Sequence, residues 1–248
     1  MYKRRPQNQS GFTIVELMIA TVVLSVALLI ATMTIMGVGR LYYKGQNAAR
    51  TNDTARNAIE EISRQIQFSP DSPNLYAAPK ISGCPNAPGE TTQSFWCYET
   101  GSGKVYGYCI GNTRYSFALG TQFIDGINHG LWEDTMAGAD VTNCKPLDVL
   151  HVQGDGTPKT PTGAVGGTDG KELLLPHMRV MGLEITQNTT TGAYEVTLDV
   201  AYGDDDLLNA PTVDTNHPAL LPQTCKTTVG DQFCATANLT TSVTRRLE

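Results

Sequence analysis

Charge is scarce in this 248-residue chain. Only 17% of its residues are charged, against about 25% in an average soluble domain. The net charge of −6 argues against a protein whose task is to neutralise phosphate groups. The sequence patterns of a serine hydrolase, a zinc protease, a phosphate-binding loop and a dinucleotide site are all missing. We therefore expect neither an enzyme nor a cofactor nor a bound nucleic acid.

Cysteine is missing from the first 83 residues of the chain. The six cysteines are Cys84, Cys97, Cys109, Cys144, Cys225 and Cys234. A zinc site is not expected, because there is no Cys-x2-Cys pair and the histidines at 129, 151, 177 and 217 are scattered. An even number of cysteines indicates disulfides made in an oxidising compartment. Six cysteines allow 15 pairings, of which Cys225–Cys234, Cys84–Cys97 and Cys109–Cys144 are the predicted ones.

Charge is wholly absent from Leu17 to Gly39, a run of 23 residues. A helix of that length is about 35 Å long, enough to cross a hydrocarbon core of about 30 Å. The run is longer than the apolar region of a secretory signal peptide, about 7–15 residues, and no convincing Ala-x-Ala cleavage site follows it. The sequence therefore predicts a membrane span, with a buried helix of a soluble protein as the alternative.

The orientation of this span follows from the cysteines. Basic residues stand on both sides of it: Lys3, Arg4 and Arg5 before it, and Arg40, Lys44 and Arg50 after it. Such clusters favour the cytoplasmic side, but their number is equal on the two sides. Because all the cysteines follow the span, we expect the N-terminus inside and the large remainder outside.

One acid, Glu16, interrupts the apolar segment that begins at Phe12. A carboxylate at mid-bilayer costs about 2.5–3.5 kcal/mol and less near the interface, and no Lys or Arg lies within one helical turn. An interfacial glutamate that reaches the headgroups is one interpretation. The run from Ser10 to Ala20, S-G-F-T-I-V-E-L-M-I-A, however, resembles the type III signal sequence of type IV prepilins. It has their short basic leader, Gly, Phe, three residues and Glu at the start of a membrane span.

The resemblance implies a processing and an assembly site at the N-terminus. In that family a membrane-bound prepilin peptidase would cut between Gly11 and Phe12 and methylate the new amine of Phe12. A glycine suits a tight peptidase site because it has no side chain. The cationic amine supplies the partner that Glu16 lacks, and this glutamate is expected to attract the terminus of a neighbouring subunit. Without the leader, 15 Lys and Arg face 24 Asp and Glu, a net charge of −9.

Residues 40–68 continue the helix as an amphipathic segment. Apolar residues recur at helical spacing, at Leu41, Ala48, Ala55, Ile59, Ile62 and Ile66. Glu60 and Arg64 have the i,i+4 spacing of a helical ion pair. Pro70 ends the helix, since the residue before a proline avoids the helical region. A helix from Phe12 to Phe68 has 57 residues and is about 85 Å long, and we expect its second half to pack on the protein's own head.

The span departs from many major pilins at one position. They carry a proline at the twenty-second mature residue, which is Met33 here, and this span has no proline. The loosening of the helix that such a proline allows in major pilins is therefore not carried over.

The head is predicted to be an antiparallel sheet, which gives an α+β, pilin-like fold. Predicted strands are Ser94–Glu99, Lys104–Ile110, Arg114–Leu119, Leu147–Gln153, His177–Gln187, Ala193–Tyr202 and Thr236–Leu247. The predicted divisions are a leader (1–11), a transmembrane assembly helix (12–39), its amphipathic continuation (40–69) and an extracytoplasmic head (70–248). A solvated acidic turn is expected at Asp204-Asp205-Asp206, with a calcium site completed by Asn209 as the alternative.

The head is large and acidic. From Cys84 onward, nine Lys and Arg face 19 Asp and Glu, a net charge of −10, which disfavours DNA capture. Its size resembles that of PilW-type minor pilins, and this predicts a tip subunit that primes assembly of a type IV pilus. A minor pseudopilin of type II secretion, a displayed adhesin or DNA-capture module and a membrane-anchored hydrolase are the alternatives.

The expected partners and locations follow from the resemblance. The partners would be prepilin peptidase, other major and minor pilins, the inner-membrane assembly platform and, before assembly, membrane lipid. The precursor would cross the cytoplasmic membrane once, and the mature protein would reach the pilus and the cell surface.

Overall fold

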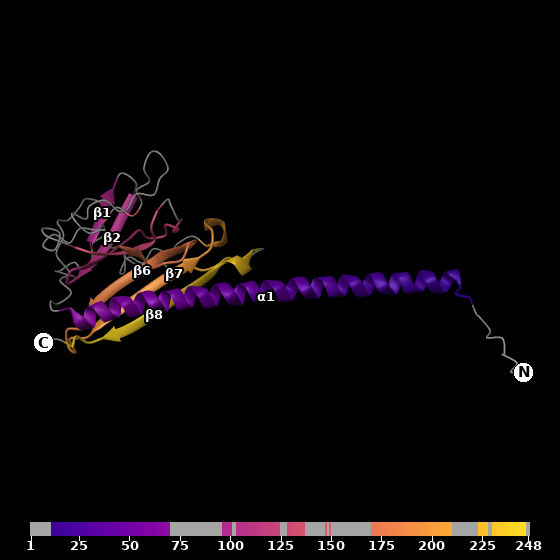
Figure 1. Ribbon diagram of the computed structural model, residues 1–248, viewed down its shortest axis with the longest axis horizontal. Helices are drawn as coiled ribbons and strands as arrows, with labels where there is room; N and C mark the ends of the chain where they lie inside the picture. The colour runs from indigo at the N-terminus through magenta and orange to yellow at the C-terminus, as the bar shows by residue number, and fades with distance from the viewer. Residues whose placement is uncertain are drawn as a thin grey trace, which may run out of the picture. The chain divides into compact units, whose positions relative to one another are not determined.

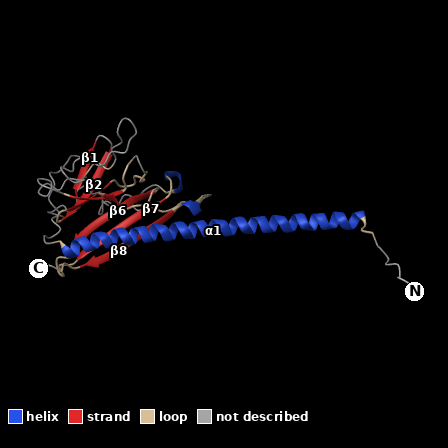
Figure 2. Cartoon of the chain, in the orientation of Figure 1, coloured by secondary structure: helices blue, strands red, loops and turns tan. Residues whose placement is uncertain are grey.

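The computed structural model describes residues 11–69, 96–100, 103–124, 128–136, 147, 149, 170–209, 223–227 and 230–246. The chain divides into two compact units, residues 1–43 and residues 44–248. Figure 1 colours the chain from its N-terminus to its C-terminus, and Figure 2 distinguishes its helices from its strands. The predicted divisions after residues 11, 39 and 69 stay predictions.

A single long helix, α1, occupies Ile14–Phe68 and has 55 residues. Its sequence contains no proline, so no residue between 14 and 68 interrupts the helical hydrogen bonds. The helix ends one residue before Ser69, which precedes Pro70, as the backbone restriction before proline requires. The predicted helix is therefore confirmed, with its start two residues later than expected.

The first sheet of the head has five antiparallel strands in the order β1-β2-β3-β4-β5. They are β1 (Trp96–Thr100), β2 (Gly103–Ile110), β3 (Thr113–Phe117), β4 (Leu131–Thr135) and β5 (Lys171–Glu172). The first three strands were predicted from the sequence, whereas β4 and β5 were not. The strand predicted at Leu147–Gln153 is not seen at Leu147 or Val149, and its other residues lie outside the described part of the chain.

The second sheet has three antiparallel strands in the order β6-β7-β8. They are β6 (Met178–Gln187), β7 (Tyr194–Tyr202) and β8 (Ala235–Val243). The strands predicted at His177–Gln187 and Ala193–Tyr202 are confirmed, and they form a hairpin in which Leu183 pairs with Leu198 and Ile185 pairs with Val196. The predicted last strand ends four residues early, because beyond Val243 the chain turns to α1, where the Arg246 amide donates to the Gln67 carbonyl over 3.1 Å.

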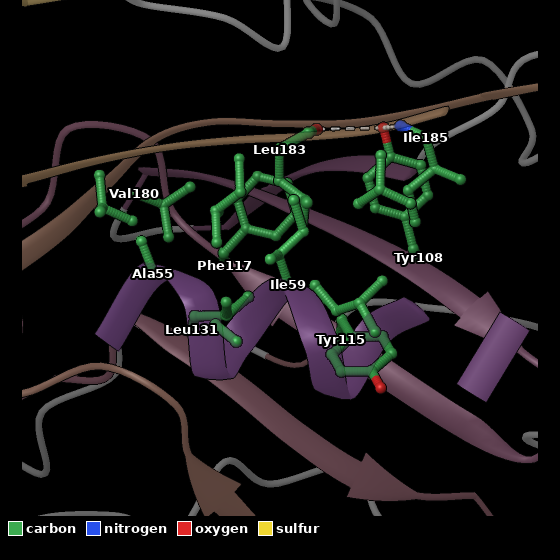
Figure 3. Close-up of a cluster of buried hydrophobic side chains, with 14 of the residues drawn as sticks. Ala55, Ile59, Tyr108, Tyr115, Phe117, Leu131, Val180, Leu183 and Ile185 are labelled. Carbon is green, nitrogen blue, oxygen red and sulfur yellow. Dashed lines mark hydrogen bonds between the residues drawn. The ribbon is translucent and has the colours of Figure 1, made fainter. Parts of the chain in front are cut away.

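The two sheets are joined by the segment that follows β3. The amide of Gly120 donates to the carbonyl of Val180 over 2.8 Å, and that of Phe123 donates to the carbonyl of Met178 over 2.6 Å. The hydroxyl of Tyr108 on β2 donates to the Leu183 carbonyl over 3.1 Å and accepts from the Ile185 amide over 3.3 Å. These bonds hold both sheets against one core (Figure 3).

The core forms where the second half of α1 meets both sheets. The buried apolar residues of the helix are Ala55, Ala58, Ile59, Ile62 and Ile66. They contact side chains from the two sheets, among them Tyr115, Phe117, Leu131, Val180 and Leu183. The expected packing of the helix on the protein's own head is confirmed from Ala55 onward. Leu41, by contrast, is 72% exposed, so the buried stripe begins later than the apolar pattern alone predicted.

An ion-pair network fastens α1 to the first sheet. Arg64 pairs with Glu61 rather than with Glu60, which corrects the predicted i,i+4 pair. Glu61 also contacts Lys171 of β5. The Nζ of Lys171 lies 3.3 Å from Glu61 Oε1 and 3.3 Å from Glu133 Oε1. Lys171 therefore bridges the helix and β4.

Shortening Ile62 tests how much of the head's stability the helix stripe provides. Ile62 is fully buried, and we expect Ile62→Ala to lower the free energy of unfolding by about 2–5 kcal/mol. Urea denaturation of the purified full-length protein in detergent measures this change. The matched control is Arg56→Ala, an exposed position on the same helix, which should change stability by about 0.5 kcal/mol or less. Equal losses in the two variants would contradict the packing described here.

Candidate functional site

The predicted processing site lies just before the start of α1. Gly11, Phe12 and Thr13 precede the first helical residue, and all three are exposed. The Phe12 side chain is 81% exposed, and a Cβ at Gly11 would meet no atom within 4 Å. Within the described residues, the peptide bond between Gly11 and Phe12 is thus non-helical and open on all sides.

Glu16, the third residue of α1, forms a cap at the start of the helix with Thr13. Its Oε2 accepts from the Thr13 amide and from the Thr13 hydroxyl, each over 2.9 Å, while the Thr13 hydroxyl accepts from the Glu16 amide over 3.3 Å. This reciprocal arrangement is a capping box, which satisfies backbone donors that a helix N-terminus leaves free. Thr13 was not predicted as a partner of Glu16, although the Thr-x-x-Glu spacing signals this motif.

The apolar first half of α1 exposes its side chains all round. From Phe12 to Tyr43, the large apolar side chains of this first unit are between 52% and 81% exposed. Among the described residues, α1 is the one helix whose length and composition allow it to cross a membrane. A helix with an apolar surface on every side requires an apolar environment, either lipid or other helices.

The hydroxyl groups in this apolar segment bond to their own helix. Thr21 donates to the Met18 carbonyl, and Ser25, Thr32 and Thr34 donate to the carbonyls four residues before them, over 2.6–2.9 Å. A hydroxyl without a partner is costly in hydrocarbon. These bonds therefore make the segment compatible with lipid despite its four polar side chains.

A disulfide closes a loop at the C-terminal end of the head. Cys225 and Cys234 are bonded, with their Cα atoms 5.7 Å apart, which confirms this predicted pair. The loop contacts the helix, because Lys44 Nζ lies 2.9 Å from an Asp231 carboxylate oxygen and the Asn47 amide donates to the Gln232 carbonyl over 2.9 Å. The disulfide thereby holds the loop against α1 at the start of the second unit.

The other two disulfide predictions remain open. Cys109 is disulfide-bonded, and it lies on β2. Cys84 and Cys144 lie outside the described residues, and the side chain of Cys97 on β1 is not described. The pairs Cys84–Cys97 and Cys109–Cys144 therefore stay predictions.

The acidic turn uses its polar groups within the head. Asp205 pairs with the buried Arg179, the Asp204 carboxylate accepts from the Gln122 amide over 3.0 Å, and the Asp206 carbonyl accepts from Lys226. The Asn209 amide donates to the Thr224 hydroxyl over 2.8 Å. In the described part of the chain, no three Asp, Glu, His or Cys side chains gather as metal ligands. The calcium hypothesis therefore finds no support in this turn.

Two carboxyl groups of the head have raised pKa values. Burial raises the pKa of Glu133, against the opposing effect of Lys171, and burial raises the pKa of Asp199, against a hydrogen bond from Asn238. Perturbed carboxyls often mark functional sites. Here, however, Glu133 on β4 lies opposite Lys171 on β5, and Asp199 on β7 lies opposite Asn238 on β8. Their shifts accompany structural contacts.

Of the four histidines, the structure describes His129 and His177, whose rings lie near different carboxylates, Glu172 and Asp204. The His129 ring packs on Trp132 with centroids 4.2 Å apart, and its Nδ1 lies 3.3 Å from Glu172 Oε2. The Glu172 carboxylate also accepts hydrogen bonds from the backbone amides of Gly130 and Leu131, over 3.0 and 2.8 Å. These bonds hold the chain in place at the start of β4. His151 and His217 lie outside the described residues.

Replacing Thr13 tests the capping box. Thr13→Val removes the hydroxyl that both donates to and accepts from Glu16, and loss of a cap costs about 1 kcal/mol. We expect amide hydrogen exchange at residues 14–17 to become roughly fivefold faster in the full-length protein in detergent, since about 1.4 kcal/mol corresponds to tenfold. Thr32→Val is the matched control, because its hydroxyl bonds within the helix interior. Unchanged exchange at residues 14–17 would show that the box contributes nothing.

The comparisons bear on this N-terminal segment. The family model described as the prokaryotic N-terminal methylation motif matches residues 6–32. Neither the curated proteins nor the solved structures give a significant match to the chain. The matched residues include the Gly11–Phe12 bond, the capping pair and the first half of the exposed apolar segment. Together, the methylation motif and the long apolar helix support the assignment of the chain as a type IV pilin-like protein, a pilin or a pseudopilin.

Proposed function

We propose that this protein is a minor subunit of a type IV pilus that primes assembly and stays at the tip of the filament. The observation that carries the proposal is the methylation motif placed at the start of α1, whose apolar membrane-span window has no buried side chain. The exposed apolar surface of this helix would be stable in lipid before assembly and among the helices of other subunits after it. The head adds a separate folded body to that assembly helix.

Processing would occur at the bond between Gly11 and Phe12. The bond lies before the helix, and its surroundings are open, so a peptidase can bind the backbone without first unwinding α1. Cleavage gives Phe12 a free amine, which the peptidase then methylates. The new cation stands four residues from Glu16, at the N-terminal end of α1, where the helix macrodipole favours the carboxylate.

Assembly would change the partners of Glu16. In the isolated subunit the carboxylate is held by Thr13, and in the filament it would meet the Phe12 amine of a neighbouring subunit. An opposite charge in a medium of low dielectric offers a stronger interaction than neutral donors do. The pairing would also set the axial position of each subunit, because apolar helices alone have no fixed register.

Glu16→Gln separates the charge of this residue from its role in the cap. Glutamine is accepted at this position of a capping box, so the helix start should persist, whereas the attraction for the neighbouring amine is lost. We expect normal amounts of cleaved protein in the membrane but at least a tenfold loss from sheared filaments, equivalent to about 1.4 kcal/mol. Immunoblots of the membrane and filament fractions measure both quantities.

The same assay includes Glu16→Ala, which removes the charge and the cap together. It should reduce incorporation at least as much as the glutamine variant. Normal incorporation of Glu16→Gln beside poor incorporation of Glu16→Ala would assign the requirement to the cap alone, against the charge-pairing proposal. Normal incorporation of both would refute an assembly role for Glu16.

An extracytoplasmic head is supported by the disulfides. The bond between Cys225 and Cys234 requires an oxidising compartment, and the basic residues Lys3, Arg4 and Arg5 favour the cytoplasmic side for the leader. These two observations support a precursor that crosses the cytoplasmic membrane once, with its N-terminus inside.

The tip position has its own test. The 237 residues that follow Gly11 include a large head, which would tile poorly along a shaft, whereas a tip leaves one side without neighbours. Immunogold labelling with an antibody to the head should place particles at filament ends. Uniform labelling along the fibres would contradict the tip position without affecting the proposed processing. Neighbouring genes separate the pilus from a type II secretion system, which would use the same N-terminal features.

A further inference from the structure

The apolar first unit of the chain carries charge and aromatic rings only near its two ends. Between residues 11 and 43, the charged side chains are Glu16 and Arg40, and the aromatic side chains are Phe12, Tyr42 and Tyr43. The run Leu17–Gly39 between them contains neither kind. In membrane-spanning helices, tyrosine gathers at the membrane–water interfaces, and arginine extends its charged end to the headgroups. The distribution along this unit is therefore that of a span with an interfacial layer at each end.

The spacing of these residues along α1 matches the thickness of a bilayer. The helix is unbroken through this segment (Figure 2). From Glu16 to Arg40 it rises about 36 Å, which is slightly more than a hydrocarbon core of about 30 Å. From its first residue, Ile14, to Tyr43 it rises about 44 Å, and a bilayer with its headgroup layers is about 40–45 Å thick. One placement of the helix thus puts both charged residues in headgroup layers.

Arg40, Tyr42 and Tyr43 form an exposed belt around the helix, which we call the anchor belt. Tyr42 and Tyr43 are 66% and 52% exposed, and their rings meet edge to face with centroids 6.0 Å apart. Arg40 is exposed as well. Because successive residues of a helix are about 100° apart, the three side chains leave α1 in different directions. The anchor belt therefore fits an environment that surrounds the helix, such as lipid, better than a partner on one face.

The chemistry of the anchor belt fits a phospholipid headgroup. A guanidinium binds a phosphate through two parallel N–H donors, and a tyrosine places its apolar ring beside acyl chains and its hydroxyl among polar groups. In the described part of the chain, Lys44 pairs with Asp231, whereas no acid forms an ion pair with Arg40. The charge of Arg40 is thus directed to the surroundings of the helix.

We propose that the anchor belt binds phospholipid headgroups of the leaflet farther from the N-terminus and thereby holds Glu16 in the headgroup layer of the nearer leaflet. The inference rests on the membrane-anchored precursor of the proposed function and is independent of the pilus role. Before assembly, Glu16 then faces headgroups and water and keeps its bonds to Thr13.

This placement has a consequence for the release of the subunit from the membrane. A movement of the helix toward the farther leaflet would carry the Glu16 carboxylate into hydrocarbon, where a charge is costly. The same movement would withdraw Arg40 and the two tyrosines from their headgroups. Both ends of the helix therefore oppose release until the amine of a neighbouring subunit pairs with Glu16.

Depth-dependent fluorescence quenching tests the proposal in the full-length protein, reconstituted into phosphatidylcholine vesicles. An environment-sensitive fluorescent amino acid replaces Leu17, Leu29 or Leu41 in three separate variants. The positions are matched, because each is a leucine with an exposed fraction of 59–72%. They follow one another at intervals of about 18 Å along the helix. The vesicles carry a nitroxide quencher either on the headgroup or near the end of an acyl chain.

The labels at Leu17 and Leu41 should be quenched roughly threefold more by the headgroup nitroxide than by the chain nitroxide. The label at Leu29 should show the reverse, since about 18 Å of helix separates it from each of the others. Stronger chain quenching at Leu17 or Leu41 would overturn the proposal and leave the membrane span intact. A Leu29 label that neither nitroxide quenches would overturn the membrane-anchored precursor together with the inference.

Variants of the anchor belt separate its side chains from the length of the helix. Arg40→Gln, Tyr42→Leu and Tyr43→Leu together should let the Leu41 label enter the hydrocarbon and lower its headgroup-to-chain quenching ratio roughly threefold, because neither Gln nor Leu prefers the interface as Arg and Tyr do. Tyr42→Trp with Tyr43→Trp is the control and should keep the original ratio, since an indole also prefers the interface. An unchanged ratio in the triple variant would overturn headgroup binding by the anchor belt. The pilus role is measured separately, by the amount of the protein in sheared filaments.

Discussion

A single helix in this protein must satisfy two different surroundings. From Phe12 to Tyr43 the large apolar side chains of α1 are exposed on every side, so that half is stable only against lipid or other helices. From Ala55 to Ile66 the apolar side chains occupy one stripe, and that stripe is buried under both sheets. The head depends on this second half, because neither the five-stranded nor the three-stranded sheet has another helix of comparable length among the described residues to cover its inner face.

The polar groups follow the same division. In the apolar half, hydroxyls bond to the helix backbone and Glu16 bonds to Thr13, so each polar group has a local partner. In the head, polar partners come from distant parts of the chain, as in the buried pair of Arg114 on β3 and Asp134 on β4 and in the bridge from Lys171 to Glu61. Removing one member of such a buried pair leaves the other charge unpaired. The polar contacts of the first half therefore do not depend on the head, whereas those of the head tie distant parts of the chain together.

The features that were predictable from the sequence are those with local signals. The apolar residues of 177–187 and 193–202 predicted strands β6 and β7, and the helical spacing of Ile59, Ile62 and Ile66 predicted the buried stripe. Strands β4 and β5 have no such signal, because β4 carries two acids whose partners are far away in the sequence and β5 has only two residues. At the N-terminal site, the leader pattern predicts Gly11, Phe12 and Glu16 as the processing and assembly residues. The capping role of Thr13 is signalled by the Thr-x-x-Glu spacing and is seen in the geometry of the helix start.

The contacts between α1 and β8 constrain the order in which the head can fold. The stripe at residues 55–66 is made long before Ala237 and Val243, yet it shares a core with them. Contacts between such distant positions require a large loop to close and slow folding. The helix stripe consequently stays uncovered until β8 has been made, and the disulfide at Cys225–Cys234 forms from the same late part of the chain. Completion of the core thus waits for β8, and until then the uncovered stripe of α1 needs protection from aggregation.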